Sequence, residues 1–102
     1  MKVSEFQRLI ADLYLEKDRR RGDQTTFLWL MEEMGELSVA VRDADKAALR
    51  EELADVIAWT ASLANLHGID LEEALAAKYP GVCVRCRAKP CACPEKRSSA
   101  SG

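Results

Sequence analysis

Three glutamates stand out first, because their spacing gathers carboxylates that could bind a cation on one face of a predicted helix. Glu32, Glu33 and Glu36 project within about 100° of one another on a helix expected over about residues 27–42. Surface helices often carry such acidic pairs, so a solvated face is the ordinary explanation. Here Trp29 projects into the same sector, whereas small and polar residues lie on the opposite side. We therefore expect the acidic face to turn away from solvent.

A second pair of acids lies on the next predicted helix. Glu52 projects into an arc of apolar side chains, between Trp59 and Leu63. Asp55 lies at the edge of the same arc. A carboxylate in apolar surroundings loses several kcal/mol of hydration free energy unless a cation or hydrogen bonds compensate the loss. No basic residue within helical reach of Glu52 shares its sector, so we expect another source of positive charge.

If the two helices pack as an antiparallel hairpin, their acidic faces meet. The five converging carboxylates would be Glu32, Glu33, Glu36, Glu52 and Asp55. Like charges at this range take up protons or push the helices apart unless cations neutralise them. Because every ligand is an oxygen atom, we expect Mg²⁺ or Mn²⁺ in preference to zinc, with coordination positions open for water and substrate phosphates.

Four helices must position these side chains. Helical periodicity and stop signals place them over about residues 5–19, over about 27–42, from an aspartate cap to about His67, and in a short stretch ending near Tyr79. The expected capping residues are Ser4 with Gln7, Thr25 or Thr26, Asp43 or Asp45, and Asp70 with Glu73. The outer face of the third helix is expected to carry Glu51, Ala58, Ser62 and Asn65. No stretch alternates like a strand, so the predicted fold is all-α.

Length and composition fit a single globular domain. The chain has 102 residues, of which 48% are hydrophobic and 31% charged. Its net charge of −2 provides no general attraction to nucleic acid or to anionic membranes. We find neither an apolar run long enough for a membrane span nor a secretory leader, and therefore expect a cytoplasmic protein. A chain this short is expected to complete its core with a second copy, as a four-helix-bundle-like oligomer.

We expect a helical domain over residues 1–80 and a tail over residues 81–102. The other candidate metal ligands lie in this tail. Its cysteines follow the pattern Cys83-x2-Cys86-x4-Cys91-x-Cys93. In a reducing cytosol, clustered cysteines favour a thiolate metal site over disulfides, and the first pair has the spacing of half a zinc site. Because the second pair is unusually close, structural zinc and a flexible, reduced tail both remain open.

The tail also raises a different class of function, a non-catalytic zinc-bearing adaptor or nucleic-acid-binding module. Its basic residues are Arg85, Arg87, Lys89, Lys96 and Arg97. No aromatic residue is interleaved among them, and this alternative leaves the apolar setting of Glu52 unexplained. We therefore expect no nucleic-acid partner.

Two motifs in order carry a resemblance to a known family. Glu32-Glu33-x-x-Glu36 followed by Glu52-x-x-Asp55 resembles the EExxE and ExxD signature of the MazG-like all-α nucleoside triphosphate pyrophosphohydrolases. The similarity extends over about residues 4–79. It implies an obligate oligomer of helical hairpins, a homodimer or a dimer of dimers, that depends on Mg²⁺. It also implies cleavage of a nucleotide to a monophosphate and pyrophosphate, with phosphoribosyl-ATP as a related substrate.

The resemblance also implies roles for individual residues. The metal ligands would be Glu33, Glu36, Glu52 and Asp55, and Glu32 would bind a second metal or orient the attacking water as a general base. Trp29 and Trp59 are candidates to flank a base, and Lys78 is a candidate phosphate contact, as are Lys46 and Arg50. The only histidine, His67, lies beside the Gly68 stop and is expected to interact with a helix end. The family often continues after this lysine with a polar segment, which Tyr79-Pro80-Gly81 replaces here.

Overall fold

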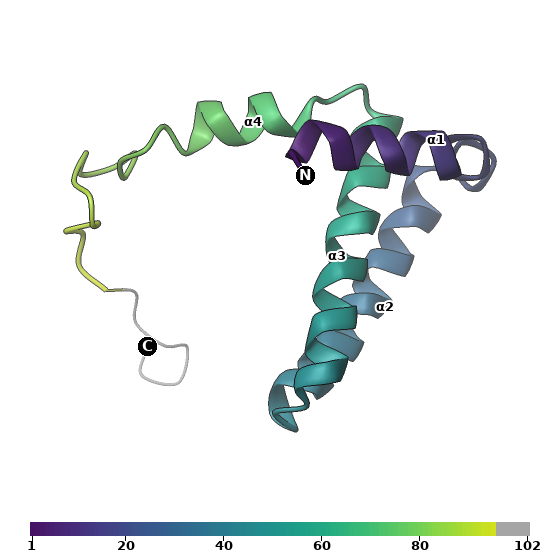
Figure 1. Cartoon of the computed structure of the whole chain (residues 1–102), viewed down its shortest axis with the longest axis horizontal. Helices are drawn as coiled ribbons and strands as arrows, with labels where there is room; N and C mark the ends of the chain where they lie inside the picture. Colours follow the sequence, from purple (N-terminus) through teal and green to yellow (C-terminus); the bar gives the residue numbers. More distant parts are fainter. Residues whose placement is uncertain (96–102) are drawn as a thin grey trace. The chain divides into compact units, whose positions relative to one another are not determined.

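The four expected helices are all present in the computed structural model of the chain, which describes residues 1–95 (Figure 1). They are α1 (Val3–Arg21), α2 (Asp23–Arg42), α3 (Lys46–Leu66) and α4 (Leu71–Lys78). No strand occurs within the described residues, which confirms the all-α expectation. Lys96 and Arg97, the last two basic residues expected in the tail, lie outside the described residues. Over residues 1–95, we also find no helix with the length and apolar character that crossing a membrane requires.

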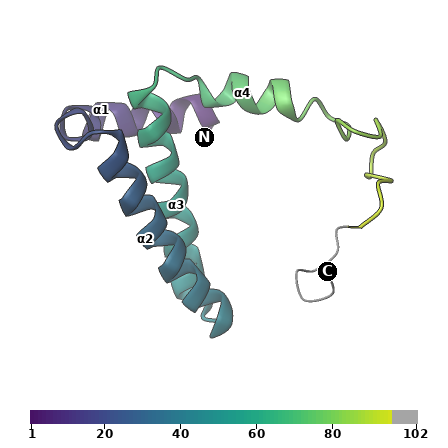
Figure 2. The same cartoon turned by 180° about the vertical axis from the view of Figure 1, so that it is seen from behind.

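The α2 and α3 helices form the expected antiparallel hairpin, visible in Figure 1 and from behind in Figure 2. A short turn joins them, in which Ala44 adopts a left-handed φ of 51°. Asp45 is the N-cap of α3, and its carboxylate accepts a hydrogen bond of 3.2 Å from the Ala48 amide. Because this bond satisfies one of the free N–H groups at the helix start, α3 begins where the sequence predicts.

The least exposed residues of α2 and α3 recur alternately every three and every four positions. On α2 they are Thr26, Leu30, Glu33, Leu37 and Ala40, and on α3 they include Leu49, Glu52, Val56, Trp59 and Leu63. This spacing is typical of two helices packed along a seam. Each helix therefore brings one carboxylate into an otherwise mainly apolar stripe.

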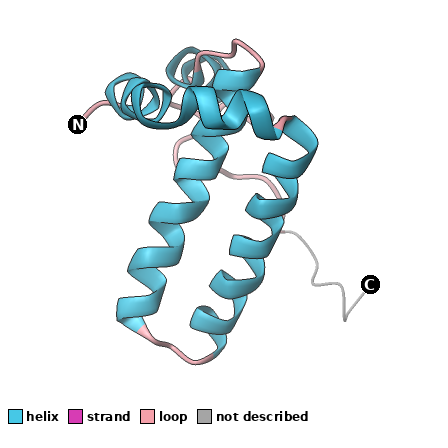
Figure 3. Ribbon diagram, turned by 90° about the vertical axis from the view of Figure 1, so that its right-hand side faces the viewer, coloured by secondary structure: helices cyan, strands magenta, loops and turns pink. Residues whose placement is uncertain are grey.

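The α1 helix lies across the end of the hairpin where α2 begins and α3 ends (Figure 3). It buries Ile10, and on α3 Ala61 and Ser62 are buried as well, at 0% and 4% exposure. The prediction that Ala58, Ser62 and Asn65 form an outer face is therefore wrong, because α1 covers that face. Only Glu51 of the expected set is exposed.

The expected capping box of α1 is also wrong. The helix begins at Val3, and the Lys2 amide donates a 2.8 Å hydrogen bond to Glu5. The Gln7 side chain points elsewhere, donating to the Ile69 carbonyl at 2.7 Å and accepting from the Leu71 amide at 2.9 Å. Gln7 thus connects α1 to the loop after α3. Glu5, and not Gln7, accepts the hydrogen bond at the start of the helix.

The start of α2 differs from the expectation in the same way. Neither Thr25 nor Thr26 caps the helix, because α2 begins at Asp23 directly after Gly22. Gly22 has a φ of 86°, a conformation that glycine adopts without a steric penalty. The polar residues before and after Gly22 are therefore helical, and this glycine alone separates α1 from α2. The Thr26 hydroxyl lies inside the helix and donates to the Gly22 carbonyl at 2.7 Å.

Contacts within the chain separate two units, Met1–Glu72 and Glu73–Gly102. In the second unit α4 ends at Lys78, before Pro80-Gly81, as expected from the helix-breaking proline. The rest of its described part has no helix, and none of residues 73–95 is buried.

Candidate metal centre and adjoining pocket

Three of the five expected carboxylates come together in the hairpin. Glu33, Glu36 and Glu52 each offer an oxygen atom, and these atoms all lie within 4.8 Å of one another. Glu33 and Glu36 share a face because residues three apart in a helix are neighbours. Glu52 reaches them from α3 because the antiparallel hairpin places its first half opposite the second half of α2. Glu33 and Glu52 are partly buried and Glu36 is exposed.

The neighbours of Glu33 raise the pKa of its carboxyl. A hydrogen bond with Glu52 raises the pKa of Glu33 from 4.5 to about 7, with further contributions from burial and from the charges of Glu36, Glu52 and Asp55. Near pH 7 the Glu33 carboxyl is therefore about half protonated, because the adjacent carboxylates disfavour its ionisation. The cluster is chemically unlike a solvated acidic surface.

Two oxygen atoms in the cluster have no partner. Glu33 Oε2 and Glu52 Oε2 are buried and accept no hydrogen bond. An unpaired buried acceptor costs about 1–3 kcal/mol, and more when it is charged. No ion pair within residues 1–95 involves Glu33, Glu36 or Glu52. Oxygen donors with unused lone pairs and no protein cation fit a hard divalent ion such as Mg²⁺ or Mn²⁺.

The other two expected ligands lie differently. Asp55 is exposed, but its charge contributes to the raised pKa of Glu33, so it borders the cluster. Glu32 is exposed and lies outside the group of three. Adjacent residues on a helix differ by about 100° in direction, which explains why Glu33 enters the seam and Glu32 does not.

A cavity of about 360 Å³ adjoins Asp55 between α1 and α3. Its lining consists of Ile10, Tyr14, Lys17, Asp18, Arg21, Asp55, Ala58, Trp59 and Ser62. The Arg21 guanidinium lies 5.0 Å from the centroid of the Trp59 ring, a cation–π contact. The cavity is large enough for a small ligand, and its lining combines apolar side chains with four charged residues, Lys17, Asp18, Arg21 and Asp55.

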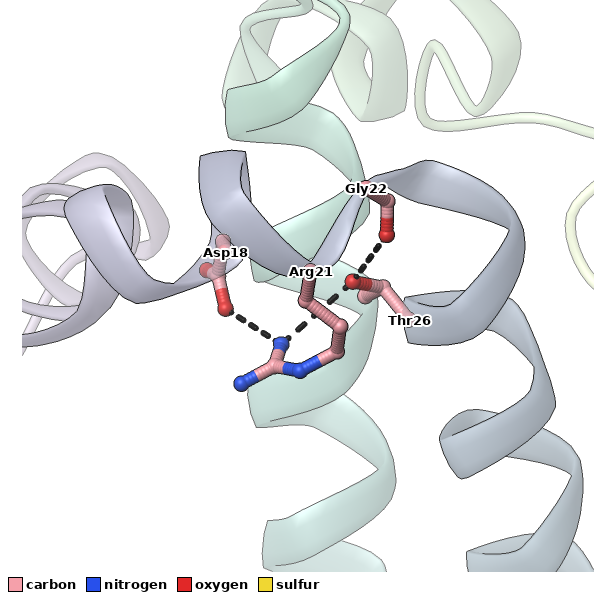
Figure 4. A network of polar contacts seen from close by, with 4 residues as sticks. All are labelled: Asp18, Arg21, Gly22 and Thr26. Atoms are coloured by element: carbon pink, nitrogen blue, oxygen red, sulfur yellow. Dashed lines mark hydrogen bonds and ion pairs between the residues drawn. The ribbon is translucent and has the colours of Figure 1, made fainter.

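Asp18 and Arg21 organise one wall of this cavity (Figure 4). Arg21 Nη1 donates to Asp18 Oδ1 at 2.7 Å and to Thr26 Oγ1 at 3.3 Å. Asp18 is 1% exposed, and its second oxygen, Oδ2, is buried without a hydrogen-bond partner. Arg21 therefore joins the end of α1 to the start of α2, and the buried Asp18 carboxylate retains an unused acceptor.

Sequence reasoning missed this acid, although a signal for it exists. Ile10, Tyr14 and Asp18 recur every four residues, so Asp18 continues a stripe that α1 buries in part. Arg21, one turn later, supplies the partner that makes a buried carboxylate tolerable.

The remaining candidates differ in their exposure and surroundings. Trp29 is 44% exposed and does not line the cavity, whereas Trp59 does. His67 Nε2 is 3.1 Å from Asp23 Oδ2, a contact between the C-cap of α3 and the first turn of α2. Lys78 is exposed and belongs to the second unit. Lys46 and Arg50 are exposed on α3.

An all-α hairpin with clustered carboxylates at its seam defines the class of the protein. Residues 21–85 match the MazG nucleotide pyrophosphohydrolase domain, which is more than half of the chain. The chain therefore belongs to the MazG nucleotide pyrophosphohydrolase domain family, and the resemblance seen in its motifs is confirmed. The match contains the whole hairpin and begins at the last residue of α1. No curated protein matches the chain.

Proposed function

We propose that the protein is a Mg²⁺- or Mn²⁺-dependent hydrolase that cleaves a nucleoside triphosphate or a related nucleotide to a monophosphate and pyrophosphate. The observation that carries this proposal is the group of three carboxylates with two unpartnered, buried oxygens, Glu33 Oε2 and Glu52 Oε2. Family membership supports the reaction class. The alternative, a non-catalytic adaptor, leaves these carboxylates without a role.

Glu33, Glu36 and Glu52 would hold the cation, and Asp55 borders them from the same helix as Glu52. When bound, the cation supplies charge neutralisation for the phosphates, the main requirement of phosphoryl transfer. For these residues to act as ligands, the proton held near Glu33 must leave, because a carboxylate binds a cation in its ionised form.

Glu32 is the proposed general base. Its carboxylate is exposed and adjoins Glu33 in the chain, so it is free to accept a proton from water. As the water oxygen bonds to phosphorus and the pyrophosphate leaves, the proton of the water passes to a Glu32 carboxylate oxygen. Glu33, Glu36 and Glu52 would contribute by holding the cation, since carboxylates alone repel phosphates.

The cavity between α1 and α3 is the proposed site for the nucleoside. It adjoins Asp55 and has the ring of Trp59 in its wall. Asp18 Oδ2 is a buried acceptor without a donor, which favours a base with an exocyclic amino group over one that presents a carbonyl there. Trp29 and Lys78, outside this cavity, stay as predictions of further substrate contacts.

A second copy of the chain is the proposed partner of the hairpin. The buried hydrophobic residues of the described chain are Ile10, Ala40, Ala61 and Ala64. Large apolar side chains remain exposed on α2 and α3, among them Phe27, Leu28, Met31, Met34, Leu53 and Ile57. So small a core requires further burial, which a homodimer or a dimer of dimers would supply. Sedimentation equilibrium measures this directly, and a monomer would contradict it.

The test is a panel of ribo- and deoxyribonucleoside triphosphates with phosphoribosyl-ATP, assayed for pyrophosphate release with Mg²⁺. We expect Glu52→Gln to reduce turnover by at least about 100-fold, because it removes a ligand charge and keeps the side-chain shape. The matched control is Glu51→Gln, an exposed neighbour on the same helix, which should leave turnover unchanged. Equal activity of both variants would remove the site.

Two further outcomes of the panel are informative. Preferred cleavage of nucleotides with an amino-bearing base supports the role of Asp18, and preference for uracil or thymine contradicts it. A wild-type protein that cleaves nothing in the panel, yet binds RNA or DNA with strong salt dependence, would favour the adaptor alternative.

A further inference from the structure

The second unit contains a cluster of four thiol sulfurs, whose ligand chemistry differs from that of the carboxylates. The Sγ atoms of Cys83, Cys86, Cys91 and Cys93 all lie within 4.8 Å of one another. Cys83 Sγ and Cys93 Sγ are 3.8 Å apart. A zinc ion with bonds of about 2.3 Å to a tetrahedron of sulfurs separates each pair of sulfurs by about 3.8 Å. The Cys83–Cys93 distance matches that value, and the 4.8 Å limit on the other pairs leaves room for a tetrahedral thiolate site.

The same spacing does not fit disulfides. All four cysteines are free thiols, and a disulfide would bring two sulfurs to about 2.05 Å. Two disulfides would require short distances within two pairs only. Here every sulfur lies near the other three, which a single central ion explains and separate bonds do not.

The backbone around the thiols supports the same conclusion. The Cys83 carbonyl accepts from the Arg87 amide at 2.8 Å, and the Cys83 amide donates to the Ala88 carbonyl at 3.0 Å, so this stretch forms a closed turn. The Ala92 amide donates to Cys86 Sγ, and the Cys93 amide donates to Cys91 Sγ, both at 3.3 Å. Amide donors directed at sulfur favour the charged thiolate, which is the form that binds metal.

Burial of apolar side chains does not hold the described part of this segment in shape. None of residues 73–95 is buried, so hydrophobic packing does not offset the conformational entropy lost in ordering the turns. The binding free energy of a metal ion serves that purpose in small domains that lack a core. The family match ends at residue 85, so three of the four cysteines lie beyond it.

We propose that Cys83, Cys86, Cys91 and Cys93 bind one Zn²⁺ in a closed, structural four-thiolate site. Each thiol releases its proton as its sulfur binds the ion. Four protein ligands leave no open position, so the site holds the tail together and performs no chemistry. Soft thiolates select zinc and hard carboxylates select Mg²⁺, so one chain binds two different metals at two sites.

The test measures zinc directly in the full-length protein. Elemental analysis of protein purified without chelators should give about one zinc per chain. Replacement by Co²⁺ should give the visible absorption of a tetrahedral cobalt–thiolate centre, a signal that does not depend on nucleotide hydrolysis. Wild-type protein that carries no zinc and develops no such absorption with Co²⁺ would overturn the proposal.

Variants identify the ligands. Cys83→Ser and Cys93→Ser should each lower the zinc content at least about tenfold, because a closed site needs all four ligands. Val84→Ala, an exposed neighbour in the same turn, is the control and should retain the metal. Glu52→Gln should also retain zinc, so failure of this proposal is distinguishable from failure of the proposed hydrolase. Circular dichroism is the check that the cysteine variants keep their helices. Full zinc content in either cysteine variant would exclude that residue as a ligand and contradict the site.

Discussion

The Glu33 carboxyl makes the stability of the metal-free protein depend on pH. Its pKa is raised from 4.5 to about 7, first by the hydrogen bond with Glu52 and then by burial and neighbouring charges. Between these two pH values the native state binds this proton more tightly than the unfolded chain does. The contribution of Glu33 to folding is therefore fully present below the lower value and is lost as the pH rises through the higher one.

We accordingly expect the metal-free protein to lose stability between about pH 5 and about pH 8. Glu33→Gln should flatten this dependence, because the amide does not titrate, and Glu51→Gln should preserve it. Mg²⁺ should restore stability most at the higher pH, since the carboxylates are then ionised and bind the cation. Thermal unfolding of chelator-treated protein over this range is the measurement. Identical pH profiles for the wild type and Glu33→Gln would show that the Glu33 proton does not affect folding.

At the residue scale, helical periodicity predicts the direction of some acidic side chains and not of others. Glu52 was predictable, because its position amid apolar residues of α3 fixes the direction of its side chain. Glu32 and Glu33 are both acidic and adjacent, so the helical pattern alone did not show which one enters the seam. That choice depends on the contact with α3. Asp18 escaped detection because the apolar stripe before it is short.

At the scale of elements, α3 is covered by α2 on one side and by α1 on another, whereas α2 is covered mainly by α3. A helical wheel finds the apolar face that meets α2, but Ala58, Ser62 and Asn65 look like a solvated face by composition alone. Such small and polar side chains also let another helix approach closely, and α1 does so. Hydrogen bonds between Gln7 and Asn65, at 3.0 Å and 3.2 Å, satisfy the polar groups in that contact. Long-range contacts of this kind were not deducible from local spacing.

The corner between α1 and α2 depends on one ion pair, which leads to a prediction about stability. Arg21→Ala leaves the Asp18 carboxylate buried without its cation. We expect the free energy of unfolding to fall by about 2–3 kcal/mol, below the cost of breaking a fully buried pair, because the Arg21 side chain is 22% exposed. Chemical denaturation of the two proteins measures the difference.

Arg20→Ala is the matched control for this corner. Arg20 is an exposed neighbour on the same helix, and its removal should change stability by less than about 0.5 kcal/mol. The double variant Asp18→Asn with Arg21→Ala should recover part of the loss, since no unpaired charge remains. Equal stability of the Arg21 and Arg20 variants would mean that solvent reaches Asp18 and the pair contributes nothing.

At the scale of the whole molecule, the chain combines a helical unit and a cysteine-bearing unit with different ligand chemistry. The sequence predicted a change of character near Pro80-Gly81, because the composition changes there. It left zinc and a flexible tail equally open, since the spacing between Cys91 and Cys93 is uncommon for zinc ligands. The mutual distances of the sulfurs, which depend on turns closed by backbone hydrogen bonds, are what favour the metal.

The two units should therefore lose their functions independently. Truncation after Tyr79 removes all four cysteines and keeps every carboxylate of the hairpin. We expect the shortened protein to retain Mg²⁺-dependent hydrolysis within about twofold and to contain no zinc, because the hard and soft ligand sets select different ions. Hydrolysis and zinc content are measured on the same sample, with circular dichroism to show that the helices persist.

Full-length Cys93→Ser is the control that separates zinc from the tail itself, because it removes the metal and keeps every basic residue. If the truncated protein folds but loses turnover while Cys93→Ser keeps it, the tail contributes a side chain such as Arg85 or Arg87 to the phosphates. If both lose turnover, zinc positions that side chain. Either result would contradict independent units, whereas full activity in both variants assigns the reaction to the hairpin alone.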